Sequence, residues 1–141
     1  MRSTFSLALI LSAACDAPAT DESIVELGRL EFFDDPVIIN VPSSVKKRQP
    51  FQVQVVTYGG GCISFERTDV QVAMDGVDFL PYDRRDIPAN GLCFANLSPI
   101  THEEYVVFDE PGRHVIRIHG RRYNARVDEP IVIQMTTSVE L

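Results

Sequence analysis

Residues 51–58, Phe-Gln-Val-Gln-Val-Val-Thr-Tyr, alternate between apolar and polar side chains and place Phe51, Val53 and Val55 on one face. A period of two residues is typical of a β-strand that buries one face and exposes the other. The glycines at 59–61 interrupt the alternation and mark a turn or a bulge. The stretch therefore predicts a strand whose Phe51 face belongs to a hydrophobic core.

A hairpin is predicted downstream of this strand. Residues 70–74 alternate, Asp75-Gly76 is a preferred two-residue hairpin turn, and residues 77–80 return along the partner strand. Proline lacks the backbone N–H that a ladder needs, so we expect Pro81 to end the pairing. We expect residues 83–101, which contain several prolines and an Asn-Gly pair, to be irregular.

Other short runs of β-branched and aromatic residues are separated by turn signals. They cover residues 28–33, 37–41, 105–108, 115–119 and 131–137. About seven short strands with no convincing helix predict an all-β fold, either a two-sheet sandwich or a small barrel.

Three local features resemble immunoglobulin-like bacterial domains over roughly residues 36–140. They are the prolyl turn before Phe51, the Phe-x-x-Pro-Gly step at 108–112 and the Ile-x-Ile-x-Gly ending at 116–120. The resemblance implies an immunoglobulin-like two-sheet sandwich. It implies an architecture only, because such sandwiches serve many unrelated functions.

The composition and the net charge limit the class of protein and the partners that we expect. A chain of 141 residues with 45% hydrophobic and 23% charged residues suits one globular domain. The formal net charge of −7 repels nucleic acid and anionic lipid headgroups, so we expect no nucleic-acid partner. The short basic clusters Lys46-Lys47-Arg48 and Arg121-Arg122 are expected to be solubilising turns.

The N-terminus has the order of an export signal. A short start with one positive charge, an apolar stretch at 5–11 and small residues at 12–14 lead directly into Cys15. This pattern resembles the lipobox of bacterial lipoproteins, which implies that the sulfur of Cys15 is lipidated and that cleavage precedes it. We expect a signal peptide at 1–14, a flexible tether at 15–26 and a β-sandwich at 27–141, with ordinary secretion as the alternative.

With Cys15 assigned to a lipid, Cys62 and Cys93 are left as a pair. Exported proteins meet an oxidising compartment, so we expect these two cysteines to form a disulfide. The loop of about 30 residues that it closes corresponds to roughly 3–4 kcal/mol of stabilisation in the chain-entropy description. A metal pair or a redox pair is disfavoured because there is no C-x-x-C spacing.

Residues that could carry chemistry form no catalytic or metal-binding pattern. We expect His102, His114 and His119 at the surface or rim, with His114 and His119 on opposite faces of one strand. Asp83 and Asp86 are expected in a solvated loop, and no Gly-x-Ser-x-Gly elbow is present. The sequence therefore predicts no catalytic residues, no metal site and no cofactor.

Together these features favour a non-enzymatic lipoprotein of the cell envelope. It would contact the membrane through its N-terminal lipid and bind another protein or an extracellular polymer, with loops 59–66 and 83–101 as the expected contact surface. A structural spacer or assembly component of the envelope and a metal or small-ligand carrier are the alternatives.

Overall fold

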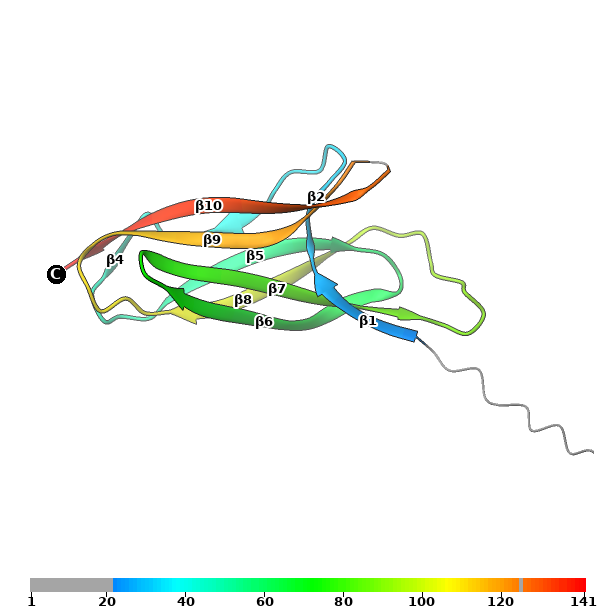
Figure 1. The fold of residues 1–141 in the computed structure, drawn as a ribbon, viewed down its shortest axis with the longest axis horizontal. Coiled ribbons are helices and arrows are strands. Elements are labelled where there is room, and N and C mark those ends of the chain that lie inside the picture. The colour runs from blue at the N-terminus through cyan, green and yellow to red at the C-terminus, as the bar shows by residue number, and fades with distance from the viewer. Residues whose placement is uncertain (1–21, 125) are drawn as a thin grey trace, which may run out of the picture.

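The computed structural model describes residues 22–124 and 126–141. Cys15 and the predicted signal peptide lie outside the described residues. Within them the chain forms ten strands and no helix, arranged as two layers of an elongated molecule (Figure 1). The strands are β1 (Glu22–Leu27), β2 (Arg29–Phe32), β3 (Ile39–Asn40), β4 (Ser44–Lys46), β5 (Phe51–Gly59), β6 (Ile63–Ala73), β7 (Gly76–Ile87), β8 (Ser98–Val106), β9 (Gly112–Tyr123) and β10 (Asp128–Glu140).

The strands form one large and one small sheet. The seven-stranded sheet has the order β1-β7-β9-β10-β4, with β2 paired to β9 and β6 paired to β7. The three-stranded sheet has the order β3-β5-β8. The prediction of an all-β, two-sheet sandwich is confirmed, and β1 and β4, which were not among the expected strands, raise the strand number above seven.

The core lies between the two sheets. The predicted face of β5 is buried, and it meets residues of β7 and β9 from the larger sheet. The buried cluster is Leu30, Phe51, Val53, Val55, Val77, Phe79, Val106, Phe108, Ile116, Ile118 and Val139. Each large apolar side chain of this kind contributes about 1.5–3 kcal/mol through its removal from water. Alternation along β5 and β9 gives each strand one apolar face, and the burial of these faces between the sheets is the main contribution that holds the layers together.

The expectation that Pro81 ends the hairpin is wrong, because β7 continues through it to Ile87. The Pro81 carbonyl accepts a hydrogen bond from the Gly28 N–H at 2.9 Å. In a strand the N and C=O of one residue point to the same side, so the ring nitrogen of Pro81 faces Gly28. There β7 leaves β9 and begins to pair with β1, so the proline removes no bond to β6. The irregular segment expected at 83–101 shrinks to residues 88–97.

The folded domain also begins earlier than expected. The predicted tether reached residue 26, but Glu22–Leu27 forms β1 and pairs antiparallel with β7 from Glu22↔Ile87 to Leu27↔Tyr82. The β-branched residues of this segment suit a strand, and the Glu26 carboxylate forms an ion pair with Arg121 at 2.8 Å. Pairing with the second half of β7 therefore orders these residues.

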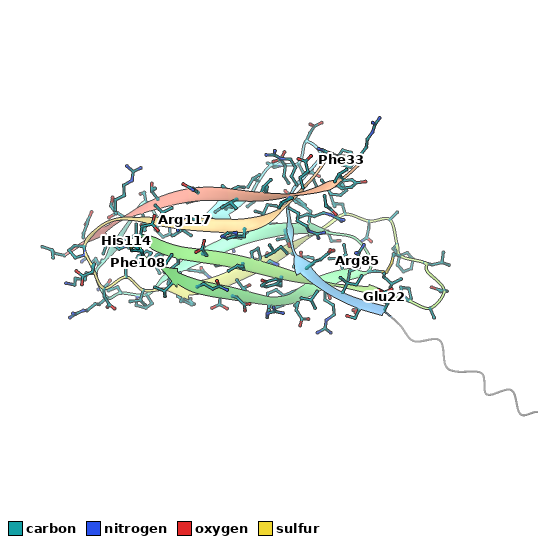
Figure 2. The ribbon with its side chains drawn as sticks, viewed as in Figure 1. Glu22, Phe33, Arg85, Phe108, His114 and Arg117 are labelled. Carbon is teal, nitrogen blue, oxygen red and sulfur yellow. A yellow bond between two sulfur atoms is a disulfide. The ribbon has the colours of Figure 1, made fainter. Side chains whose placement is uncertain are left out.

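The elongated sandwich has two distinct ends (Figure 1). We call the end that contains Glu22, the turn 60–62 and the loop 88–97 the entry end, because the described chain begins there. The opposite end, called the far end, contains the β6–β7 turn at 74–75, the loop 107–111 and the C-terminus. Figure 2 shows Glu22 and Arg85 toward the entry end and Phe108 and His114 toward the far end.

Candidate functional site

A disulfide shapes the entry end. Cys62 in the turn 60–62 and Cys93 in the loop 88–97 are bonded, with a Cα–Cα distance of 5.5 Å and a sequence separation of 31. The bond joins two irregular segments rather than two strands. Backbone hydrogen bonds reinforce it, since the Gly61 N–H donates to the Phe94 carbonyl at 3.0 Å. The predicted disulfide is present and fixes the loop 88–97 against the sandwich.

The close approach of the two segments requires glycine at position 61. A Cβ added there would lie 2.7 Å from the Phe94 Cβ and 2.9 Å from its backbone nitrogen. At the neighbouring Gly60 the nearest atom, the Asn96 carbonyl oxygen, is 3.4 Å away. Gly61, rather than the whole run 59–61, therefore allows the loop to pack against the turn 60–62.

The loop 88–97 exposes apolar side chains to solvent. Leu92 is 75% exposed and Phe94 is 84% exposed, while Leu97 is about half-exposed. A hollow of about 330 Å³ lies behind the loop and is lined by Phe94, Leu97 and Phe32, among others. The loop sequence, Pro-Ala-Asn-Gly-Leu-Cys-Phe-Ala-Asn-Leu, contains no charged residue. The entry end is thus an apolar protrusion, and the expected contact loops 59–66 and 83–101 reduce to the turn 60–62 and the loop 88–97.

The far end carries a second apolar surface. Val72 is 90% exposed and Met74 is fully exposed at the β6–β7 turn, and Val107 is half-exposed beside them. They border a hollow of about 250 Å³ that also involves Phe108 and His114. The His114 ring stacks on Phe108 with a centroid distance of 4.2 Å, so it forms one wall of this hollow. We call Val72, Met74, Val107 and this hollow the far-end patch.

Four polar side chains meet inside the sandwich. His102 on β8 and Asp83 on β7 are completely buried, and the His102 Nε2 lies 3.0 Å from the Asp83 Oδ1. Thr57 on β5 donates to the Asp83 Oδ2 at 2.8 Å, and the Thr68 hydroxyl on β6 lies 3.0 Å from the His102 Nδ1. This set, called the polar cluster, connects both sheets. The predictions of a surface His102 and a solvated Asp83 are therefore wrong.

The hydrogen bonds of the polar cluster determine where the imidazole proton lies. The His102 Nε2 faces the Asp83 Oδ1 at 3.0 Å and the Thr57 hydroxyl oxygen at 3.2 Å. Thr57 gives its single proton to Asp83 and an ionised Asp83 only accepts, so in this state the His102 Nε2 carries a proton and donates it to Asp83. Thr68 can then donate to the His102 Nδ1. A hydroxyl, an imidazole and a carboxylate are the groups of a nucleophilic triad, but the His102 ring has no exposed surface with which to meet a substrate. The geometry favours a structural role for the polar cluster.

Charged side chains near the entry end form a second network. The Arg29 guanidinium holds Asp128 with two hydrogen bonds of 2.8 Å, and the Arg121 Nη1 lies 2.8 Å from Glu26 and 3.2 Å from Asp128. The hydrogen bonds from Arg29 hold the pKa of Asp128 below its ordinary value. Arg121, expected in a solubilising turn, instead lies on β9, where its ion pairs join this strand to Glu26 of β1 and Asp128 of β10.

The other predicted residues form no shared site. His114 lies on the core side of β9 against Phe108, whereas His119 has the opposite parity and its Nε2 is 2.7 Å from the Asp78 Oδ1. The prediction that these histidines face opposite sides is confirmed. Among residues 22–124 and 126–141, no group of three or more His, Cys, Asp or Glu side chains is placed to hold a metal ion.

Comparisons with known proteins give no relative. No protein-family model matches the chain, and no curated protein or solved structure matches it. Within the described residues there is no helix with the length and apolar character needed to cross a membrane. The surfaces and clusters above are therefore the basis for a functional proposal.

Proposed function

We propose that this chain is a non-enzymatic, lipid-anchored protein of the bacterial cell envelope that binds another protein through its far-end patch. The observation that carries the proposal is the distribution of exposed apolar side chains. Among the large hydrophobic residues of the described chain, the five most exposed all lie at the two ends of the sandwich, and they are Met74, Leu141, Val72, Phe94 and Leu92.

An anchor at Cys15 gives the two ends different surroundings. Seven residue steps separate Cys15 from Glu22, a length that spans at most about 25 Å when fully extended. The entry end would therefore stay close to the membrane. Strand β7 contains 12 residues, and at 3.3–3.4 Å per residue it carries the far end about 40 Å further out. Such an arrangement presents the far-end patch to other envelope components.

The chemistry of the far-end patch suits a protein partner. Its centre is aliphatic and includes Met74, whose flexible thioether side chain adapts to irregular surfaces. Charged residues surround it, including the Asp75–Arg117 ion pair and the exposed Asp109. An apolar centre inside a polar rim is the usual anatomy of a protein–protein interface. An extracellular polymer rich in hydroxyl groups would gain little from exposed valine and methionine.

The non-enzymatic part of the proposal is supported by the polar cluster. Asp83 and His102 are the residues best suited to acid–base catalysis by type, but they are hydrogen-bonded to each other in the interior. A role in holding two sheets together accounts for all of their contacts.

Site-specific photocrosslinking in the native envelope tests the proposal. A photoreactive amino acid at Met74 is expected to give one discrete adduct with another protein, and Val72→Ser with Val107→Ser should abolish it. The matched control is the same amino acid at Thr101, an exposed position in the middle of β8, which should give no adduct. Equal labelling at both positions, or none at Met74, would remove the far-end patch as the binding surface.

A further inference from the structure

We propose that the disulfide-linked loop 88–97 docks into the surface of the lipid bilayer, so that Leu92 and Phe94 reach the boundary between the headgroups and the acyl chains. The inference rests on the lipid anchor of the proposed function and goes beyond it, because an anchor alone would leave the domain free to tumble. It assigns a second membrane contact to the folded domain itself.

The loop 88–97 lies next to the start of β1, where the chain enters the described domain. Glu22 pairs with Ile87, the last residue of β7, and the loop begins at the next residue. The loop therefore starts beside the point where the chain leaves the described domain (Figure 1). A tether of at most about 25 Å from Cys15 holds this part of the surface near the bilayer and keeps the far end away from it.

The chemistry of the loop suits a bilayer surface. Between Pro88 and Leu97 it has no charged side chain, and its most exposed large hydrophobic side chains are Leu92 and Phe94. Backbone groups at its tip are already paired, since the Gly91 N–H donates to the Pro88 carbonyl at 2.7 Å and the Leu92 N–H donates to the Asn90 Oδ1 at 3.0 Å. Transfer out of water therefore leaves fewer unpaired polar groups, which is the main penalty for a loop in lipid.

The disulfide provides rigidity for this contact. Cys93 lies between Leu92 and Phe94 and is fixed to Cys62 on the sandwich. Because the loop is already held, docking costs little additional conformational entropy. Reduction of the disulfide is therefore expected to weaken the contact.

The surrounding charge selects the type of lipid. Glu22 and Asp86 are exposed beside the start of the loop, and the whole chain has a net charge of −7. Anionic headgroups would be repelled by these carboxylates. The loop should therefore dock more strongly on zwitterionic bilayers than on anionic ones.

Tryptophan fluorescence tests the inference, because the sequence contains no tryptophan. The full lipidated chain with Phe94→Trp is reconstituted in phosphatidylcholine vesicles that carry brominated acyl chains. The matched control is Met74→Trp at the far end. We expect the Phe94→Trp emission to move to shorter wavelength and to be quenched by the bromines, while Met74→Trp emits as in water. Emission from Phe94→Trp that matches the control would overturn the inference.

The same samples separate this inference from the anchor. Intact mass shows whether the chain carries acyl groups, so a lipidated chain with a water-exposed Phe94→Trp refutes the docked loop and leaves the anchor intact. An unlipidated chain whose Phe94→Trp is still quenched supports the docked loop and refutes the anchor. Shielding in native membranes but not in protein-free vesicles would assign the loop to a protein partner and overturn the inference.

Discussion

Replacing His102 by leucine should destabilise the protein strongly. The substitution fills the fully buried position with an apolar side chain of moderate size, but it removes the 3.0 Å hydrogen bond to the Asp83 carboxylate. Asp83 would then remain buried with Thr57 as its side-chain donor. Breaking a buried pair by removing one partner costs about 3–5 kcal/mol. This is a large part of the roughly 5–15 kcal/mol that stabilises a typical domain.

Urea unfolding at neutral pH, with the disulfide intact, measures this loss as a lower midpoint at unchanged slope. The matched control is His119→Leu, because His119 pairs with Asp78 at 2.7 Å but both side chains remain about one quarter to one third exposed. That change should cost only about 0.2–1 kcal/mol. If His102→Leu costs no more than the control, the polar cluster does not hold the two sheets together.

Three further changes test the disulfide, the charge network and the loop packing. Replacing Cys62 and Cys93 together by alanine should lower the free energy of unfolding by about 4 kcal/mol in urea titrations, and a loss under about 1 kcal/mol would contradict the chain-entropy account. The pKa of Asp128 is lowered in the folded state, so its contribution is complete above about pH 4 and is lost as the pH falls through that lowered value. Asp128→Asn should therefore be less stable at neutral pH and should lose less stability on acidification to about pH 2, as urea midpoints will show. Gly61→Ala should lower the thermal midpoint well below that of Gly60→Ala, because an added Cβ meets backbone atoms within 3.0 Å at position 61 but not at position 60; equal midpoints would refute the packing argument.

Local sequence signals predicted much of the fold. The alternation of Phe51, Val53 and Val55 identified a strand and its buried face. Asp75-Gly76 located a two-residue hairpin, but the turn lies one residue earlier than predicted, at Met74 and Asp75, and Gly76 is already the first residue of β7. These signals depend only on residues that are close together in the sequence, so they can be recognised without the structure. Pro81 was misjudged because its effect depends on which strand faces its nitrogen, and that is decided by the distant Gly28.

The candidate surfaces were predictable to different degrees. The pairing of Cys62 with Cys93 followed from the cysteine count once export was assumed, whereas the polar cluster was missed. Its members come from β5, β6, β7 and β8, so only the folded sandwich brings them together. One signal was present, because the period-two parity of Val77 and Phe79, continued through Pro81, places Asp83 on the buried face. Following that parity past the proline would have found it.

The most direct test of the account is the intact mass of the protein taken from its native membrane, with and without reduction. We expect the mass of residues 15–141 plus acyl groups, increased by two hydrogens when the Cys62–Cys93 disulfide is reduced. A chain that still begins at Met1, carries no lipid and has free thiols would contradict the anchor, the envelope location and the oxidised loop together.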